Sequence, residues 1–205
     1  MRIIDISQEV FASEVYEGDP APIRKILAST ERGDLYNLTA FSMCAHNGTH
    51  IDAPYHFLGN GARVEQIPLE NTVGCAFVAE HHGLLSGADA AKILLRAERE
   101  NPESAKRILL KGDLTVTEEA AKVFANARIL LLGNESQSVG PLDAPMAVHL
   151  ALLGAGIVLL EGIRLSAAKE GVYFLSASPL NLGGADGAPC RAVLIDTMDA
   201  DKNLL

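Results

Sequence analysis

The sequence predicts an α/β protein with a mixed sheet, and three observations support this class. Short apolar or β-branched runs of strand length recur along the whole chain. Amphipathic stretches of helical length separate several of them in the second half. The first 80 residues contain mostly strand and turn patterns, so we expect a mixed sheet and not one made entirely of parallel strands joined by helices.

The predicted strands are short runs of apolar residues bounded by charged residues or turn formers. Two of them, RILLKG and RILLLG, are almost continuously apolar, which is typical of parallel strands buried on both faces. The six predicted strands are RIIDIS (2–7), LTAFSMCA (38–45), VGCAFVAE (73–80), RILLKG (107–112), RILLLG (128–133) and RAVLID (191–196).

The predicted helices begin and end with the residues that such positions favour. Ser86 can accept a hydrogen bond as an N-cap, Thr117 precedes two acidic residues, and Pro145 lies near the start of a stretch that ends in glycine. The helix between RILLKG and RILLLG makes these three segments a βαβ unit. The predicted helices are residues 86–101, 117–127 and 144–156.

The length and composition indicate one compact domain over residues 1–205. With 48% hydrophobic residues the chain can bury a sizeable core, and it contains no repeat or low-complexity linker. Loops rich in glycine and polar residues are candidates for function. They include GDP (18–20), GNG (59–61), GNESQSVGPLDAP (133–145) and NLGGADGAP (181–189).

The net charge of −9 argues against a nucleic-acid partner, which would require a concentrated basic patch. No apolar run approaches the ~20 residues of a membrane span, and MRIIDISQEV lacks the pattern of a signal peptide. Three widely spaced cysteines indicate neither a disulfide framework nor a cysteine zinc site. We therefore expect a cytoplasmic protein that binds neither nucleic acid nor membrane.

The segment HNGTHIDAPYHF (46–57) contains three of the six histidines. His50 and Asp52 are two residues apart, so in an extended segment their side chains point the same way. Imidazole nitrogen and carboxylate oxygen are ligands of catalytic zinc sites, which keep one position open. The alternative is a partly exposed loop whose histidines bind nothing, but the density of the pattern favours a metal site.

His149 and Glu161 are a second pair of candidate ligands. Glu161 ends the apolar run IVLLE, where a buried carboxylate needs a partner such as a cation. The alternative, that Glu161 reaches solvent while His149 packs on its helix, is equally compatible with the residues alone.

These motifs resemble those of the cyclase family of metal-dependent hydrolases, which includes bacterial kynurenine formamidases. The family motif H-x-G-T-H-x-D-x-P-x-H is matched at every fixed position by HNGTHIDAPYH (46–56). An early G-D-P turn (18–20), a His-x11-Glu pair and the closing segment PLNLGGADGAPCRAVL (179–194) follow in the family's order. The resemblance therefore extends along nearly the whole chain.

The resemblance implies a fold of the swivelling β/β/α type and a site for two divalent ions, with zinc favoured and manganese or iron as alternatives. Asp52 would bridge the two ions, and His56 would be the catalytic acid/base. The resemblance also implies a homodimer or homotetramer. The implied metal ligands are His46, His50, Asp52, His149 and Glu161.

The favoured function is hydrolysis of a small amide, with an aryl formamide such as N-formylkynurenine as substrate, in tryptophan catabolism. Kynurenine formamidases usually carry a tryptophan before the G-D-P turn, whereas this chain has no tryptophan and places Tyr16 there as a candidate substrate contact. Two alternatives therefore stay open. One is a hydrolase of a cyclic amide, a lactone or another small carbonyl compound, and the other is a non-catalytic protein that binds a metal or ligand.

Overall fold

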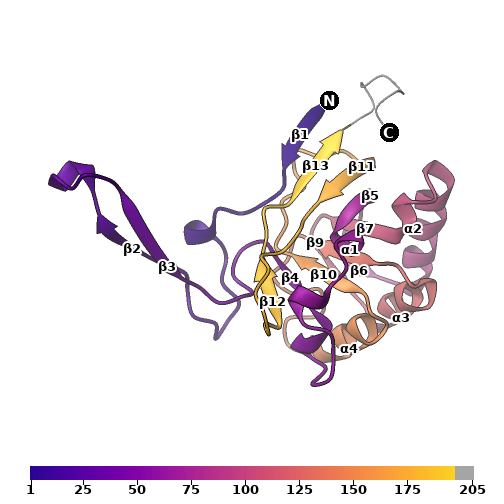
Figure 1. The fold of residues 1–205 in the computed structure, drawn as a ribbon. Helices are drawn as coiled ribbons and strands as arrows, with labels where there is room; N and C mark the ends of the chain where they lie inside the picture. Colours follow the sequence, from indigo (N-terminus) through magenta and orange to yellow (C-terminus); the bar gives the residue numbers. More distant parts are fainter. Residues whose placement is uncertain (197–205) are drawn as a thin grey trace.

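A computed structural model describes residues 1–196, which form a nine-stranded mixed sheet with helices on one face (Figure 1). The four central strands are mutually parallel and the outer strands pair antiparallel. In spatial order the strands are β1 (Arg2–Asp5), β13 (Val193–Asp196), β11 (Gly171–Ser176), β5 (Val73–Glu80), β7 (Arg107–Lys111), β9 (Leu131–Asn134), β10 (Val158–Glu161), β4 (His50–Asp52) and β12 (Gly187–Pro189).

The main helices are α2 (Gly87–Glu100), α3 (Glu118–Ala127) and α4 (Met146–Gly154), and all three cover the same face of the sheet. The predicted caps are confirmed for two of them, because the hydroxyl oxygens of Ser86 and Thr117 accept backbone N–H bonds at 3.2 Å. The predicted βαβ unit is also confirmed. Strands β7 and β9 are parallel neighbours that α3 connects.

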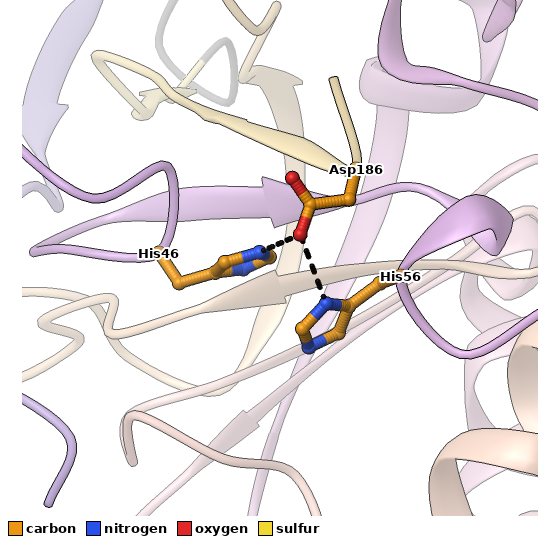
Figure 2. Close-up of side chains that lie close together, drawn as sticks. All are labelled: His46, His56 and Asp186. Atoms are coloured by element: carbon orange, nitrogen blue, oxygen red, sulfur yellow. Dashed lines mark hydrogen bonds and ion pairs between the residues drawn. The ribbon is translucent and has the colours of Figure 1, made fainter. Parts of the chain in front are cut away.

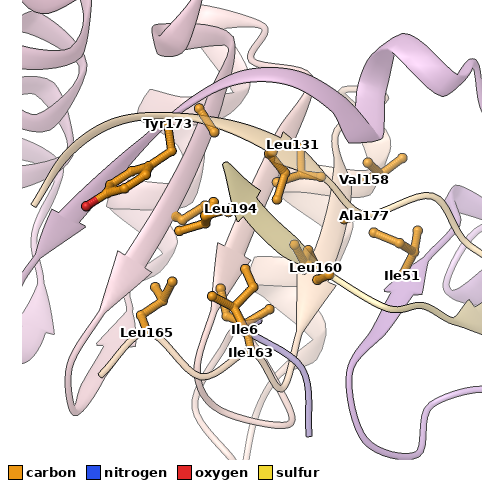
Figure 3. Close-up of a cluster of buried hydrophobic side chains, with 14 of the residues drawn as sticks. Ile6, Ile51, Leu131, Val158, Leu160, Ile163, Leu165, Tyr173, Ala177 and Leu194 are labelled. Carbon is orange, nitrogen blue, oxygen red and sulfur yellow. The ribbon is translucent and has the colours of Figure 1, made fainter. Parts of the chain in front are cut away.

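Two apolar clusters hold the layers together. One lies between the sheet and the helices, where Phe77 of β5 and Phe124 of α3 are fully buried. The other fills the opposite face, and it joins strands from both ends of the sheet, such as β1 through Ile4 and β4 through Ile51 (Figure 3). Side chains from opposite ends of a sheet can meet in this way because the sheet is curled.

Several strands differ from the sequence expectations. The run at 38–45 is a strand, β3 (Leu38–Ser42), but it pairs with the unpredicted β2 (Ile23–Ala28) in a separate hairpin outside the main sheet. Strands β4, β11 and β12 were also unpredicted. Strands β4 and β12 have only three residues each, and β11, GVYFLS (171–176), has no clear turn signal on either side. The short strands β6 (Gly83–Leu85) and β8 (Leu114–Val116) form a further parallel pair.

The remaining helical segments are single turns. They are α1 (Leu69–Thr72) and the 3₁₀ turns Val10–Ala12, Thr30–Arg32, Pro54–His56, Val64–Gln66 and Ser104–Lys106.

The predicted fold class, α/β with a mixed sheet, is confirmed. The predicted single domain over residues 1–205 includes residues 197–205, which lie outside the described part of the chain. Among the described residues, no helix combines the length and the apolar character needed to cross a bilayer.

Candidate metal centre and active site

The pairing of β4 with β10 positions the first three side chains of the candidate site. His50 and Asp52 project from the same side of β4, while Ile51 between them faces the apolar core. Glu161 lies opposite His50 in the antiparallel register. All three polar side chains are almost fully buried, at 1–2% exposure. Two carboxylates and an imidazole therefore meet inside the protein.

His46 reaches the same place from the turn that follows β3. The side chain of Asn47 accepts a hydrogen bond from the Cys44 N–H at 2.8 Å, and Gly48 adopts a positive φ of 67°. This turn places His46 Nδ1 2.8 Å from Asp52 Oδ1. A side chain at position 187 would collide with the His46 ring and with the Ile51 carbonyl, so glycine is required there.

His149 arrives from helix α4, nearly a hundred residues further along the chain. Its Nε2 lies 3.6 Å from Glu161 Oε1 and 3.9 Å from Asp52 Oδ2. The ring stacks on Phe57, with 4.5 Å between the ring centroids. The carboxylate of Glu161 is held by the Val139 N–H at 2.7 Å. The structure thus brings together all five side chains that the sequence suggested as metal ligands.

The two most buried histidines, His50 and His149, each use one ring nitrogen in a hydrogen bond and direct the other toward the buried carboxylates. His50 Nδ1 donates to the Gly48 carbonyl at 3.0 Å, and His149 Nδ1 donates to the Pro145 carbonyl at 2.8 Å. In the neutral tautomers that these bonds select, each Nε2 is an acceptor. His50 Nε2 lies 3.3 Å from Asp52 Oδ1 and 3.6 Å from Glu161 Oε2, which are also acceptors.

Acceptors facing acceptors in a buried site are unfavourable unless a metal ion or a proton lies between them. His50 Nε2 and Asp52 Oδ2 are both buried without a hydrogen-bond partner, which is costly unless another group binds them. The ligand atoms of His46, His50 and Asp52 lie within 4.8 Å of one another, and so do those of Asp52, His149 and Glu161. Donor chemistry and spacing both fit divalent metal ions, and Asp52 belongs to both groups.

The electrostatics of the pocket lead to the same conclusion. Burial alone would lower the pKa of His50, but the nearby carboxylates of Asp52 and Glu161 override this and raise it to about 10. For Asp52, burial acts to raise the pKa, but the hydrogen-bonded ring of His46 and the nearby ring of His50 hold it well below its usual value. Without metal, protons on the histidines must therefore balance the buried negative charge that metal ions would otherwise balance.

His56 lies at the rim of this cluster and is less buried than the candidate ligands. It ends a 3₁₀ turn that begins at Pro54, and its ring lies 4.1 Å from that of His46. Figure 2 shows that both rings approach the carboxylate of Asp186. Asp186 Oδ2 is 2.9 Å from His46 Nε2 and 3.3 Å from His56 Nδ1.

The sequence patterns did not identify Asp186 as a residue of the site. It lies in the glycine-rich loop 181–189, which was expected to be functional, and the signal that could have identified it is the aspartate of the closing motif G-x-D-G. A second expected loop, 133–145, supplies Gln137 and Ser138, and Asp19 comes from the G-D-P turn. The loop 59–61 does not line this pocket.

The cluster forms the floor of a pocket of about 240 Å³. Tyr16, the candidate substrate contact, lines the pocket, and its hydroxyl donates to the Leu142 carbonyl at 3.2 Å. The pocket is lined by Tyr16, Asp19, His46, His50, His56, Phe57, Gln137, Ser138, Pro145, His149 and Glu161.

Comparison with known proteins places this site in a family. A model of the family described as "Putative cyclase" matches residues 4–141. The kynurenine formamidase of Salinibacter ruber is 34% identical over 97% of this chain and all of its own length. A solved structure titled as a predicted metal-dependent hydrolase from Bacillus stearothermophilus is 28% identical, with a TM-score of 0.77 over 94% of this chain and 97% of that one.

Isatin hydrolase A from Labrenzia aggregata shares the fold, with a TM-score of 0.78, 22% identity and coverage of 94% and 93% of the two chains. The match to the family model covers most of the chain, and the full-length relative exceeds 30% identity. The chain therefore belongs to the cyclase family.

Proposed function

We propose that this protein is a metal-dependent hydrolase of small amides, acting on C–N bonds other than peptide bonds. One observation carries the proposal: buried histidine lone pairs and carboxylate oxygens converge at the floor of a pocket open to a small molecule. The proposed substrate is an aryl formamide such as N-formylkynurenine, because a full-length relative is named kynurenine formamidase. The protein would then act in tryptophan catabolism.

The proposed ligands are His46, His50 and Asp52 for one ion and Asp52, His149 and Glu161 for another. Zinc is favoured by the mixture of imidazole and carboxylate donors, which manganese and iron also accept. A divalent ion in such a site supplies a water of lowered pKa and polarises a carbonyl group. The carbonyls that hold His50 and His149 keep the rings oriented for binding.

His56 is the proposed acid/base group. It lies at the rim of the site, lines the same pocket and is not buried among the proposed ligands. Its Nδ1 is bonded to Asp186, so Nε2 is the atom free to exchange a proton with the departing nitrogen. The aromatic rings of Phe57 and Tyr16 line the pocket and provide apolar surface for an aryl group.

This function is tested by metal analysis of the purified protein followed by assays with metal removed and restored. We expect bound zinc, manganese or iron, and hydrolysis of aryl formamides that a chelator abolishes and added metal restores. The panel includes cyclic amides and lactones, because the chain lacks the tryptophan typical of formamidases. Turnover of a cyclic amide or lactone without turnover of formamides would replace the proposed substrate. Binding of metal without any turnover would contradict the proposed hydrolase.

A further inference from the structure

Asp186 lies where the candidate metal centre meets the proposed acid/base group (Figure 2). A single oxygen of its carboxylate, Oδ2, is 2.9 Å from His46 Nε2 and 3.3 Å from His56 Nδ1, within hydrogen-bond distance of both rings. An ionised carboxylate only accepts hydrogen bonds, so each of these two nitrogens carries a proton and donates it. One carboxylate therefore determines which nitrogen remains available on each ring.

The backbone around Asp186 is tied to the strand that carries two of the candidate ligands. The Asp186 carbonyl accepts the Ala53 N–H at 2.9 Å, and Gly187 pairs with Asp52 in the antiparallel register of β12 and β4. Because Gly187 has no side chain, the His46 ring can lie against it. The carboxylate is thus positioned by the same strand pairing that positions Asp52.

The two histidines are the partners that the described structure gives to this carboxylate. The Asp186 side chain is 44% exposed, yet no lysine or arginine of residues 1–196 forms an ion pair with it. The two rings come from different turns, one after β3 and one that begins at Pro54. A carboxylate that served only to keep the surface hydrated would not need to join them.

For His46, the bond to Asp186 selects the nitrogen that can bind a metal ion. With the Nε2 proton directed to Asp186, Nδ1 is the nitrogen that faces Asp52, 2.8 Å from its Oδ1. A ligand histidine whose second nitrogen donates to a carboxylate is held in one tautomer and one orientation, and it becomes a more basic ligand. Loss of Asp186 should therefore weaken the binding of the ion assigned to His46.

For His56, the same oxygen selects the nitrogen that can exchange a proton. The proton on Nδ1 is directed to Asp186, so Nε2 is left for the reaction. The rings of His56 and His46 lie 4.1 Å apart, at an angle of 31° between their planes. The shared oxygen thus holds the acid/base ring against the ring of a proposed ligand.

We propose that Asp186 is a shared positioning residue that couples metal binding to proton transfer. One oxygen orients His46 toward the ion and His56 toward the departing nitrogen, so both steps depend on the same carboxylate. The assignment for His56 rests on the proposed function, whereas the assignment for His46 is measured by metal binding and needs no substrate.

Zinc titration of the metal-free protein tests the contact with His46. With zinc alone as the probe, Asp186→Ala should bind one ion roughly 10- to 100-fold more weakly, the usual cost of losing a carboxylate partner of a ligand histidine. Binding of the other ion should change less, because its proposed ligands do not include His46. The control Asp113→Ala, which removes an exposed carboxylate from a surface turn, should bind zinc like the wild type. Equal zinc affinity in Asp186→Ala and the wild type would overturn the proposal.

Nitrogen-15 spectra of the imidazole rings in the zinc-loaded protein test both contacts. In the wild type, His46 should carry its proton on Nε2 and His56 on Nδ1. In Asp186→Ala the preference at His56 should be lost, and Asp186→Asn, whose amide oxygen still accepts, should restore it in part. An unchanged His56 tautomer in Asp186→Ala would contradict the positioning role even if no substrate were known.

Kinetics at saturating zinc provide a further measurement. Asp186→Ala should lose on the order of 10- to 100-fold in kcat with a smaller change in KM, since the missing hydrogen bond orients a catalytic ring and not the substrate. Asp186→Asn should lose less, and Asp113→Ala should match the wild type. Unchanged kcat in fully loaded Asp186→Ala would exclude an effect of Asp186 on proton transfer.

The double variant Asp186→Ala, His56→Ala distinguishes positioning from a general structural effect. If Asp186 acts on turnover through His56, its removal should cost little further kcat once His56 is absent, while zinc affinity still falls. Independent, multiplicative losses in kcat would overturn the coupling. Wild-type protein that binds zinc but hydrolyses no substrate would instead contradict the proposed function, and the zinc titration and the spectra would still decide the role of Asp186.

Discussion

Asp52→Asn is expected to lose bound metal and nearly all hydrolytic activity while the protein remains folded. Asp52 belongs to both of the proposed ion sites, and its Oδ2 is buried without a hydrogen-bond partner. The asparagine side chain has nearly the same shape as aspartate but carries no negative charge. Its NH₂ group would occupy space that the proposed ions need. Metal content per chain, turnover and a thermal melt measure the three parts of this expectation.

Asp113→Asn is the matched control for this variant, because it removes a carboxylate of the same type from a surface turn. It should keep the metal content, turnover and melting temperature of the wild type. Full metal content with normal turnover in Asp52→Asn would show that Asp52 does not hold the ions. If Asp52→Asn did not fold, the thermal melt would show it. Glu161→Gln would then be tested instead, because Glu161 belongs to only one of the proposed ion sites.

His56→Ala is expected to keep most of its metal and to lose roughly 10²- to 10⁴-fold in rate, the usual contribution of general acid–base catalysis. His56 is more exposed than the candidate ligands and contacts Asp186 through Nδ1. Its counterpart, His50→Ala, should lower metal affinity, because that ring lies between Asp52 and Glu161. Parallel measurements of bound metal and turnover in the two variants separate the two roles.

The pH dependence provides a further measure of His56. Burial lowers the pKa of this ring, so its neutral form persists to a lower pH than that of an exposed histidine, whose pKa is ~6.5. The limb of the rate profile that reports His56 should therefore have its midpoint below that value in the wild type and should change in His56→Ala. If His56→Ala lost metal to the same extent as His50→Ala, His56 would be a ligand and another group would have to move the proton.

The sequence was most informative where local patterns decide local structure. The apolar run 73–80 coincides with β5, and Ser86 and Thr117 cap the predicted helices because capping depends on atoms three residues apart. Buried parallel strands were recognisable because burial on both faces leaves almost no polar residue. The spacing of His50 and Asp52 likewise placed both side chains on one side of an extended segment, and the structure shows this in β4.

Contacts between distant segments were beyond these local patterns. The residues alone left it open whether Glu161 reaches solvent or meets His149, and the pairing of β4 with β10 decided this by placing Glu161 opposite His50. Asp186 could not be assigned from spacing, because it reaches His46 across 140 residues through the antiparallel pairing of β12 with β4. The exposed hairpin of β2 and β3 was also unpredicted, since β3 has the composition of a core strand.

The sequence by itself determined the fold class, the two capped helices and the residues able to bind a metal, since these depend on composition and on neighbours a few residues apart. The tertiary structure decided which of those side chains meet, which nitrogen of each histidine faces the carboxylates, and which apolar residues remain exposed on the hairpin of β2 and β3. The physical reason is that side-chain convergence depends on strand register and sheet curvature. Register and curvature are both set by the packing of the whole core, so they cannot be predicted from the sequence of any single segment.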